Sequence, residues 1–213
     1  MKTDDMISLL AANVAPLDPK APGRRFRWSL VVGSVGSVLL MLLVFGARPD
    51  ISTMLVTPMF WAKVAFPIVL SAAALVTVGR LSRPGISVGH GWHLVAAPLL
   101  LLWLAATATL MLAPGTERLP MVLGATWRTC ALNIGLLSIP VFIAAIRAVR
   151  ELAPTRLRTA GAAAGLLAGA IATTVYCLHC PEMGVSFWAV WYVAGMGIPV
   201  GLGAWLGPWL LRW

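Results

Sequence analysis

Charged side chains are scarce in this sequence of 213 residues: they make up 11% of it, and only seven of them are acidic. Ordinary soluble domains carry roughly 25% charged residues. Hydrophobic residues account for 60% of the chain, and a helix needs about 20 mostly apolar residues to cross a bilayer. Runs of this kind occupy 28–46, 58–79, 92–112, 127–146, 160–178 and 186–209. We therefore predict an all-α, polytopic membrane protein with six transmembrane helices.

The six runs contain no Asp or Glu, and little sequence remains between them. Ion-coupled pumps commonly use a buried carboxylate within a span, so transport is disfavoured. The short connections leave no room for a nucleotide-binding domain or an autonomous enzyme fold, and we expect a protein that is not an enzyme. The predicted organisation is a cytosolic N-terminal segment, residues 1–23, followed by a six-helix transmembrane domain, residues 24–213.

The net charge of +9 would suit a nucleic-acid-binding protein, but the basic residues flank the apolar runs. With the N-terminus inside, the inner segments hold 12 Lys and Arg residues and the outer segments hold three. The inner ones are Lys2, Lys20, Arg24, Arg25, Arg27, Arg80, Arg83, Arg147, Arg150, Arg156, Arg158 and Arg212; the outer ones are Arg48, Arg118 and Arg128. The positive-inside rule then predicts a multi-pass membrane protein with both termini in the cytoplasm, in contact with lipid and not with nucleic acid.

One further basic residue, Lys63, falls in the first two turns of the second run. A long lysine side chain near a helix end can extend its ammonium group to the membrane surface. We therefore expect Lys63 to be an interfacial anchor, with a functional charge as the alternative.

The sequence has only three cysteines, and the predicted orientation places all of them at the outer face, which in a bacterium is oxidising. Cys177 and Cys180 end the fifth run, and Cys130 begins the fourth. Cys130 can pair with either of the other two if their α-carbons approach within roughly 7 Å. With His179 as a nitrogen ligand, a metal site of Cys130, Cys180 and His179 is also sterically feasible. Cysteines that serve only packing are the remaining alternative.

Small residues recur in the last two runs. Gly161, Gly165 and Gly169 are spaced four apart, a stripe that lets another helix approach closely. The sixth run contains several glycines and Pro199, so we expect it to be kinked or tightly packed.

The N-terminal segment shows a different pattern. Its first helical turn contains Asp4 and Asp5, which are favourable at the positive end of a helix dipole. Ile7, Leu10 and Val14 then recur on one face until "PLDPKAPG" ends the helix. Such a short helix is marginal alone in water. We predict that these five residues bind a protein partner, with the membrane surface as the alternative.

Four stretches carry a family resemblance: "KTDDMISLLAANVAP", "WRTCALNIGLLSIP", "APTRLRTAGAAAGLLAGAIATTVYCLHCPEMGVSFWAVWYVAGMGIP" and the terminal "GPWLLRW". They resemble the NrsF family of six-helix inner-membrane anti-sigma factors of extracytoplasmic-function sigma factors, over nearly the whole chain. The resemblance implies a sigma factor as cytoplasmic partner and a pair of cysteines outside the cytoplasm that is associated with responses to oxidants and heavy metals. By motif, that pair falls on Cys130 and Cys180, and Cys177 is an additional thiol.

The predicted function is that of a membrane-bound anti-sigma factor in a stress response. It would hold an extracytoplasmic-function sigma factor inactive and release it when Cys130, Cys180 and Cys177 sense oxidant or heavy metal. No cofactor is expected beyond a transiently bound heavy-metal ion. The alternative is a membrane thiol–disulfide oxidoreductase that uses the C-x-x-C pair, although such enzymes usually need a second cysteine pair. A third reading is a structural subunit of a larger membrane complex.

Overall fold

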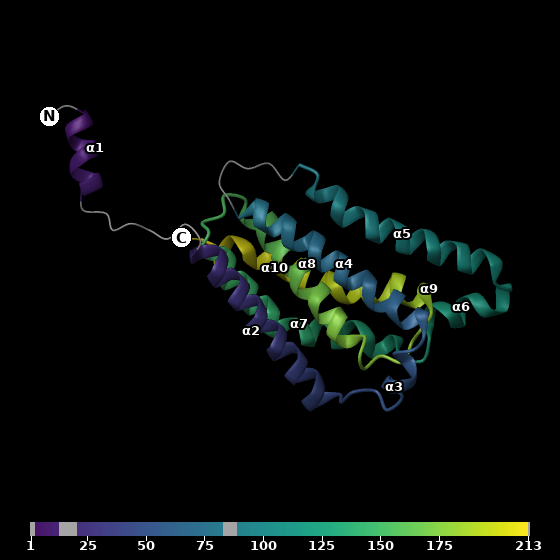
Figure 1. The fold of residues 1–213 in the computed structure, drawn as a ribbon. Helices are drawn as coiled ribbons and strands as arrows, with labels where there is room; N and C mark the ends of the chain where they lie inside the picture. The colour runs from purple at the N-terminus through teal and green to yellow at the C-terminus, as the bar shows by residue number, and fades with distance from the viewer. Residues whose placement is uncertain (1–2, 13–20, 83–88, 213) are drawn as a thin grey trace.

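The computed structural model describes residues 3–12, 21–82 and 89–212, and no strand occurs among them. Its helices (Figure 1) are α1 (Thr3–Ala12), α2 (Ala21–Val44), α3 (Ile51–Met54), α4 (Pro58–Leu81), α5 (Gly91–Leu112), α6 (Gly115–Leu123), α7 (Trp127–Arg150), α8 (Leu157–Tyr176), α9 (Val185–Phe187), the π-helix η1 (Trp188–Tyr192) and α10 (Val193–Leu210).

Six helical segments in the described part are long and apolar enough to cross a membrane. They are α2, α4, α5, α7 with the preceding α6, α8, and the continuous segment formed by α9, η1 and α10. The all-α prediction and the six predicted spans are therefore confirmed, with boundaries that differ by a few residues.

Helix α8 is the centre of the bundle and packs against α2, α4, α7 and α10. The predicted glycine stripe makes its closest contact with α10. A Cβ atom on Gly161 would collide with the carbonyl oxygen of Gly203, and one on Gly165 would collide with that of Pro199. Only glycine permits this approach of two backbones, so the stripe and the tight packing of the last span are both seen in the structure.

Helix α2 lies against α7, again through small residues. A Cβ atom on Gly33 would stand 2.9 Å from Val141 Cα and from Ala144 Cβ, and one on Gly36 would stand 3.0 Å from Pro140 Cβ. Helix α5 contacts α4, α9 and η1 at the edge of the bundle.

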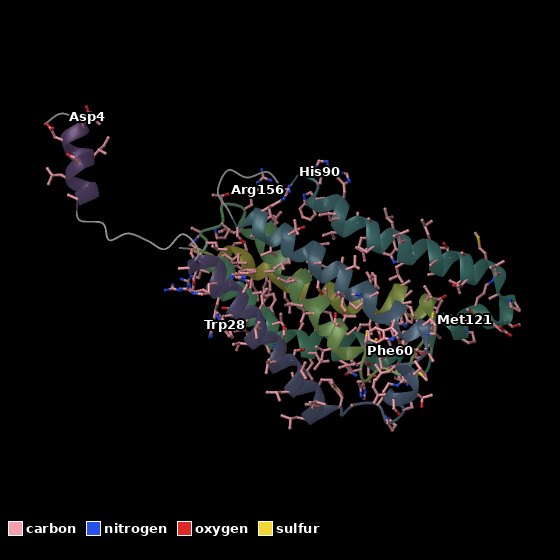
Figure 2. All side chains as sticks on the ribbon, viewed as in Figure 1. Asp4, Trp28, Phe60, His90, Met121 and Arg156 are labelled. Atoms are coloured by element: carbon pink, nitrogen blue, oxygen red, sulfur yellow. The ribbon has the colours of Figure 1, made fainter. Side chains whose placement is uncertain are left out.

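The bundle has two ends with different contents. The start of α2 and the end of α10 lie together at one end, which we call the terminal end (Figure 1). Trp28 and Arg156 lie there, whereas Phe60 and Met121 lie at the opposite end (Figure 2). The opposite end also holds the start of α7 and the end of α8, and with them all three cysteines, so we call it the thiol end.

The N-terminal helix is present as α1, which lies apart from the bundle and bears Asp4 (Figures 1 and 2). Asp4, Asp5 and Ile7 are exposed, Ile7 to 59%. Leu10 belongs to the same helix, and Val14 lies outside the described residues.

Candidate functional site

The three thiols are buried together at the thiol end. Cys130 lies in the first turn of α7, and Cys177 and Cys180 directly follow α8. All three are free cysteines with no solvent exposure. The thiols of Cys130 and Cys180 lie close enough to interact, whereas the thiol of Cys177 points to the carbonyl oxygen of Lys63 at 3.8 Å. The structure therefore brings Cys130 and Cys180 together and directs Cys177 toward α4.

The chain after α8 makes one further turn that positions Cys180. The backbone N–H groups of His179 and Cys180 both donate to the carbonyl oxygen of Tyr176, at 3.0 and 2.9 Å. Pro181 follows, and a proline cannot supply the N–H group that would continue the turn. Cys180 is thereby held at the end of the turn beside the start of α7.

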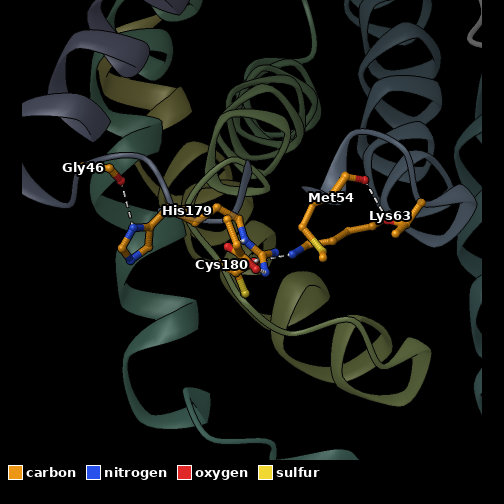
Figure 3. A network of polar contacts seen from close by, with 8 residues as sticks. Gly46, Met54, Lys63, His179 and Cys180 are labelled. Carbon is orange, nitrogen blue, oxygen red and sulfur yellow. Dashed lines mark hydrogen bonds and ion pairs between the residues drawn. The ribbon is translucent and has the colours of Figure 1, made fainter. Parts of the chain in front are cut away.

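Two cations meet the carbonyl oxygen of Cys180. Lys63 Nζ donates to it at 2.6 Å and Arg48 Nη1 at 3.3 Å, and Figure 3 shows the Lys63 side chain reaching across to Cys180. Arg48 also binds the carboxylate of Asp50 through Nε and Nη2, at 2.6 and 2.7 Å. This carbonyl follows the C-terminal end of α8, where the helix dipole favours positive charge.

The prediction of Lys63 as an interfacial anchor is wrong. Lys63 is 0% exposed. Its ammonium group donates to the carbonyl oxygen of Cys180 and lies 5.9 Å from the centroid of the Tyr192 ring. A buried ammonium group needs a polar partner, and here a neighbouring helix end supplies one. The side chain therefore turns into the bundle instead of toward its surface.

The surroundings shift the pKa values of the two cysteines after α8, Cys177 and Cys180, in opposite directions. The hydrogen bond from Cys130 lowers the pKa of the Cys180 thiol, and the nearby charge of Lys63 lowers it further against the effect of burial. Burial raises the pKa of the Cys177 thiol to about 12. Because the thiolate is the reactive form of cysteine, these shifts favour Cys180 over Cys177 as a nucleophile.

The ion pair of buried Arg48 and exposed Asp50 beside this site has both pKa values shifted away from neutral pH. The hydrogen bond to Asp50 raises the pKa of Arg48, and the hydrogen bond to Arg48 lowers the pKa of Asp50. Arg48 thus carries its charge at the Cys180 carbonyl at neutral pH.

The side chain of His179 points away from the thiols. Its Nδ1 lies 3.0 Å from the carbonyl oxygen of Gly46 (Figure 3), and its ring packs near Phe45 and Tyr176, at 5.3 and 5.8 Å between centroids. Within residues 3–12, 21–82 and 89–212, no three His, Cys, Asp or Glu side chains are grouped to hold a metal ion. The structure therefore does not assemble the ligand set of Cys130, Cys180 and His179, because the imidazole is engaged with the end of α2.

Three contacts connect residues 178–180, which we call the thiol turn, to the segment that follows α2. His179 meets Gly46, the N–H of Arg48 donates to the carbonyl oxygen of Leu178 at 3.2 Å, and the Arg48 side chain reaches Cys180. Gly46 has a φ of +70°, a conformation that glycine adopts without strain. This residue turns the chain out of α2 and over the thiol turn.

Sequence reasoning did not identify several residues of this site, namely Asp50, Tyr176, Glu182 and Tyr192. The Tyr192 hydroxyl is buried beside the thiols of Cys177 and Cys180. The Tyr176 hydroxyl accepts from Asn133 Nδ2 at 3.3 Å. Only Glu182 had a sequence signal, since it stands in the "HCPE" stretch beside the thiols.

Comparison with known proteins identifies the family. The family model NrsF, described as "Negative regulator of sigma F", matches residues 10–213. The chain is 45% identical over 213 residues to a protein of Azospira oryzae named "Probable anti-sigma-F factor NrsF", and the alignment covers 100% of both chains. It is 39% identical over 215 residues to the "Anti-sigma-F factor NrsF" of Caulobacter vibrioides, again over 100% of both. No solved structure matches the chain significantly. The chain therefore belongs to the NrsF family of negative regulators of sigma F.

Proposed function

We propose that this protein is an inner-membrane anti-sigma factor that holds an extracytoplasmic-function sigma factor inactive in the cytoplasm. It releases the sigma factor when the thiols of Cys130 and Cys180, with Cys177 beside them, react with an oxidant or a thiophilic metal ion. The observation that carries this proposal is the neighbouring pair of buried thiols, Cys130 and Cys180, at the thiol end of the bundle. Its orientation rests on the excess of basic residues in the segments at the terminal end.

The sigma factor would bind the N-terminal segment. Helix α1 stands apart from the bundle and exposes Met6, Ile7 and Leu9 beside the acidic first turn of Asp4 and Asp5. An amphipathic helix with an exposed apolar face typically docks in a groove of a partner. Leu10 and Val14 continue the apolar pattern in the sequence.

Helix α2 connects the thiol site with the N-terminal segment that would bind the sigma factor. Its far end is fastened to the thiol turn through Gly46 and Arg48, and its glycine face packs on α7, which carries Cys130. Its near end continues into the N-terminal segment. A reaction that moves Cys180 relative to Cys130 would change both attachments of α2, and a helix bundle with two arrangements would pass the change to α1. A coupling of about 1–3 kcal/mol changes partner affinity roughly 5- to 150-fold.

A metal ion would bind this site through thiolates. Cys130 and Cys180 provide two adjacent sulfur ligands of the kind that soft metal ions prefer. His179 is not needed for this binding, which would be transient and part of the signal.

The alternative function, a thiol–disulfide oxidoreductase, would use Cys177 and Cys180 as its reactive pair. In the structure these two thiols have different partners, the Lys63 carbonyl oxygen and Cys130. The geometry therefore favours Cys130 and Cys180 as the reacting pair, and the sensing function over electron transfer through the C-x-x-C motif.

The test is transcription from a promoter that depends on the sigma factor, with and without oxidant or thiophilic metal. We expect Cys130→Ser and Cys180→Ser to lock the response in one state at normal protein abundance, with a smaller effect of Cys177→Ser. An unchanged inducible response in both strains would make the thiols packing residues and place the sensor elsewhere.

A further inference from the structure

The side chain of Glu182 makes contacts that the proposed sensing reaction does not use directly. This half-buried residue follows Cys180 by two positions. Its Oε1 accepts hydrogen bonds from the N–H of Ala125 at 2.7 Å, from the N–H of Thr126 at 3.1 Å and from the hydroxyl of Thr126 at 3.2 Å. Thr126 directly precedes α7, so a carboxylate from one loop caps a helix that is distant in sequence.

Other contacts of Glu182 and Thr126 lead to the two thiols. Glu182 follows Cys180 by two residues in the loop after α8, so its backbone moves with the thiol turn. The carbonyl oxygen of Thr126 accepts the N–H of Cys130 at 3.1 Å. The loop that carries Cys180 is therefore linked through the Glu182 carboxylate and Thr126 to the backbone of Cys130.

The position of Glu182 is fixed by further contacts. Its carbonyl oxygen accepts the indole N–H of Trp188 at 3.1 Å. Gly124 closes the turn over the carboxylate with a φ of +57°, and a Cβ atom there would lie 2.8 Å from Glu182 Cδ and 2.7 Å from Phe187 Cδ2. The turn thus leaves room for the carboxylate only because residue 124 has no side chain.

The charge of Glu182 suits this place. The N–H groups of Ala125 and Thr126 lie just before the positive end of α7, and hydrogen bonds donated to a carboxylate are stronger than those between neutral groups. The bonds hold the first turn of α7, and with it Cys130, in one register relative to the loop that carries Cys180.

We propose that Glu182 is the positioning residue that holds the Cys130 thiol against the Cys180 thiol and so sets how readily this pair forms a disulfide. The importance of that pairing for signalling rests on the function proposed above, but the positioning is measurable without a sigma factor. With oxidised glutathione as oxidant, the two thiols lose two protons and two electrons and form one S–S bond. The glutathione disulfide takes these up and leaves as two molecules of reduced glutathione.

The experiment equilibrates the purified full-length protein with mixtures of reduced and oxidised glutathione and measures the fraction of Cys130–Cys180 disulfide by peptide mapping. Glu182→Ala should lower the effective concentration of one thiol for the other about tenfold or more, because hydrogen bonds to a charged group are lost. Glu182→Gln keeps an acceptor oxygen without the charge and should fall between this variant and the unmodified protein. Glu117→Ala removes an exposed carboxylate from the first turn of α6 and should change nothing.

Thermal unfolding of the reduced proteins separates positioning from general loss of structure, since the disulfide equilibrium is measured well below the unfolding temperature. If Glu182→Ala does not accumulate, Glu182→Gln decides the question. An equilibrium equal to that of the unmodified protein in the folded Glu182 variants would overturn the proposal, as would the absence of any Cys130–Cys180 disulfide in the unmodified protein. A shifted equilibrium together with normal induction in the Cys130→Ser and Cys180→Ser strains would support the positioning and reject the sensing function.

Discussion

The ammonium group of Lys63 lies 2.6 Å from the carbonyl oxygen of Cys180, in the interior of the bundle. This contact joins α4 to the turn that carries Cys180. It also places a positive charge next to that thiol, where it lowers the pKa of Cys180 in addition to the larger effect of the Cys130 hydrogen bond.

Replacing Lys63 should make Cys180 less reactive. In Lys63→Met the pKa of the Cys180 thiol should rise, because the nearby positive charge is gone, and alkylation of Cys180 at neutral pH should slow by up to about tenfold. The measurement is the rate of iodoacetamide labelling at each cysteine, by mass spectrometry. Arg128→Met is the matched control, since Arg128 lies over the Trp127 ring at 5.3 Å and is exposed. Equal labelling rates in the Lys63→Met and unmodified proteins would show that the charge does not tune the thiol.

Stability should fall at alkaline pH because of Cys177. Its thiol has a native pKa of about 12, raised by burial from 9.0. Above about pH 9 the unfolded chain releases this proton while the native protein retains it, which favours unfolding. The contribution of the protonated Cys177 thiol to folding stability is therefore complete below pH 9 and is lost as the pH rises toward 12. At pH 10.5 the loss is roughly 2 kcal/mol.

Thermal unfolding in detergent at pH 8 and pH 10.5 measures this effect. The decrease attributed to Cys177 should be absent from Cys177→Ser, whose hydroxyl does not ionise in this range. A decrease of the same size in both proteins would assign it to other groups.

A charge on the apolar face of α1 should release the sigma factor without any stimulus. Leu10→Asp should cost about 2–4 kcal/mol of binding free energy, the range of an interface hot spot. The measurement is recovery of the sigma factor with the full-length membrane protein. Ser8→Asp adds the same charge to an exposed position away from the predicted face and should bind normally. Normal binding by Leu10→Asp would move the contact to the loops at the terminal end, such as the one around Arg147 to Arg158.

Reporter fusions test the orientation. Fusions after Arg158 and after Trp213 should report a cytoplasmic location, and a fusion at Glu117 a periplasmic one, because basic residues gather in the segments assigned to the inside. The opposite pattern would place the thiols in the reducing cytoplasm and remove the basis for their proposed role.

The sequence by itself determined the spans, the helical class and the packing stripe. These features depend on local composition: the length of each apolar run, and the spacing of Gly161, Gly165 and Gly169. The placement of all three cysteines at one end also followed, because antiparallel spans of similar length bring the end of one beside the start of the next.

Only the tertiary structure decided which side chains surround the thiols. Lys63 looked like a surface anchor and His179 like a metal ligand, because sequence gives the depth of a residue and not the direction of its side chain. The bundle turns Lys63 inward to a carbonyl oxygen at the end of α8 and engages His179 with Gly46. The contact of Glu182 with the start of α7 joins parts of the chain that are more than 50 positions apart: Glu182 lies 57 positions after Ala125 and 56 after Thr126. Such contacts form only when distant helix ends pack together, and no local pattern encodes them.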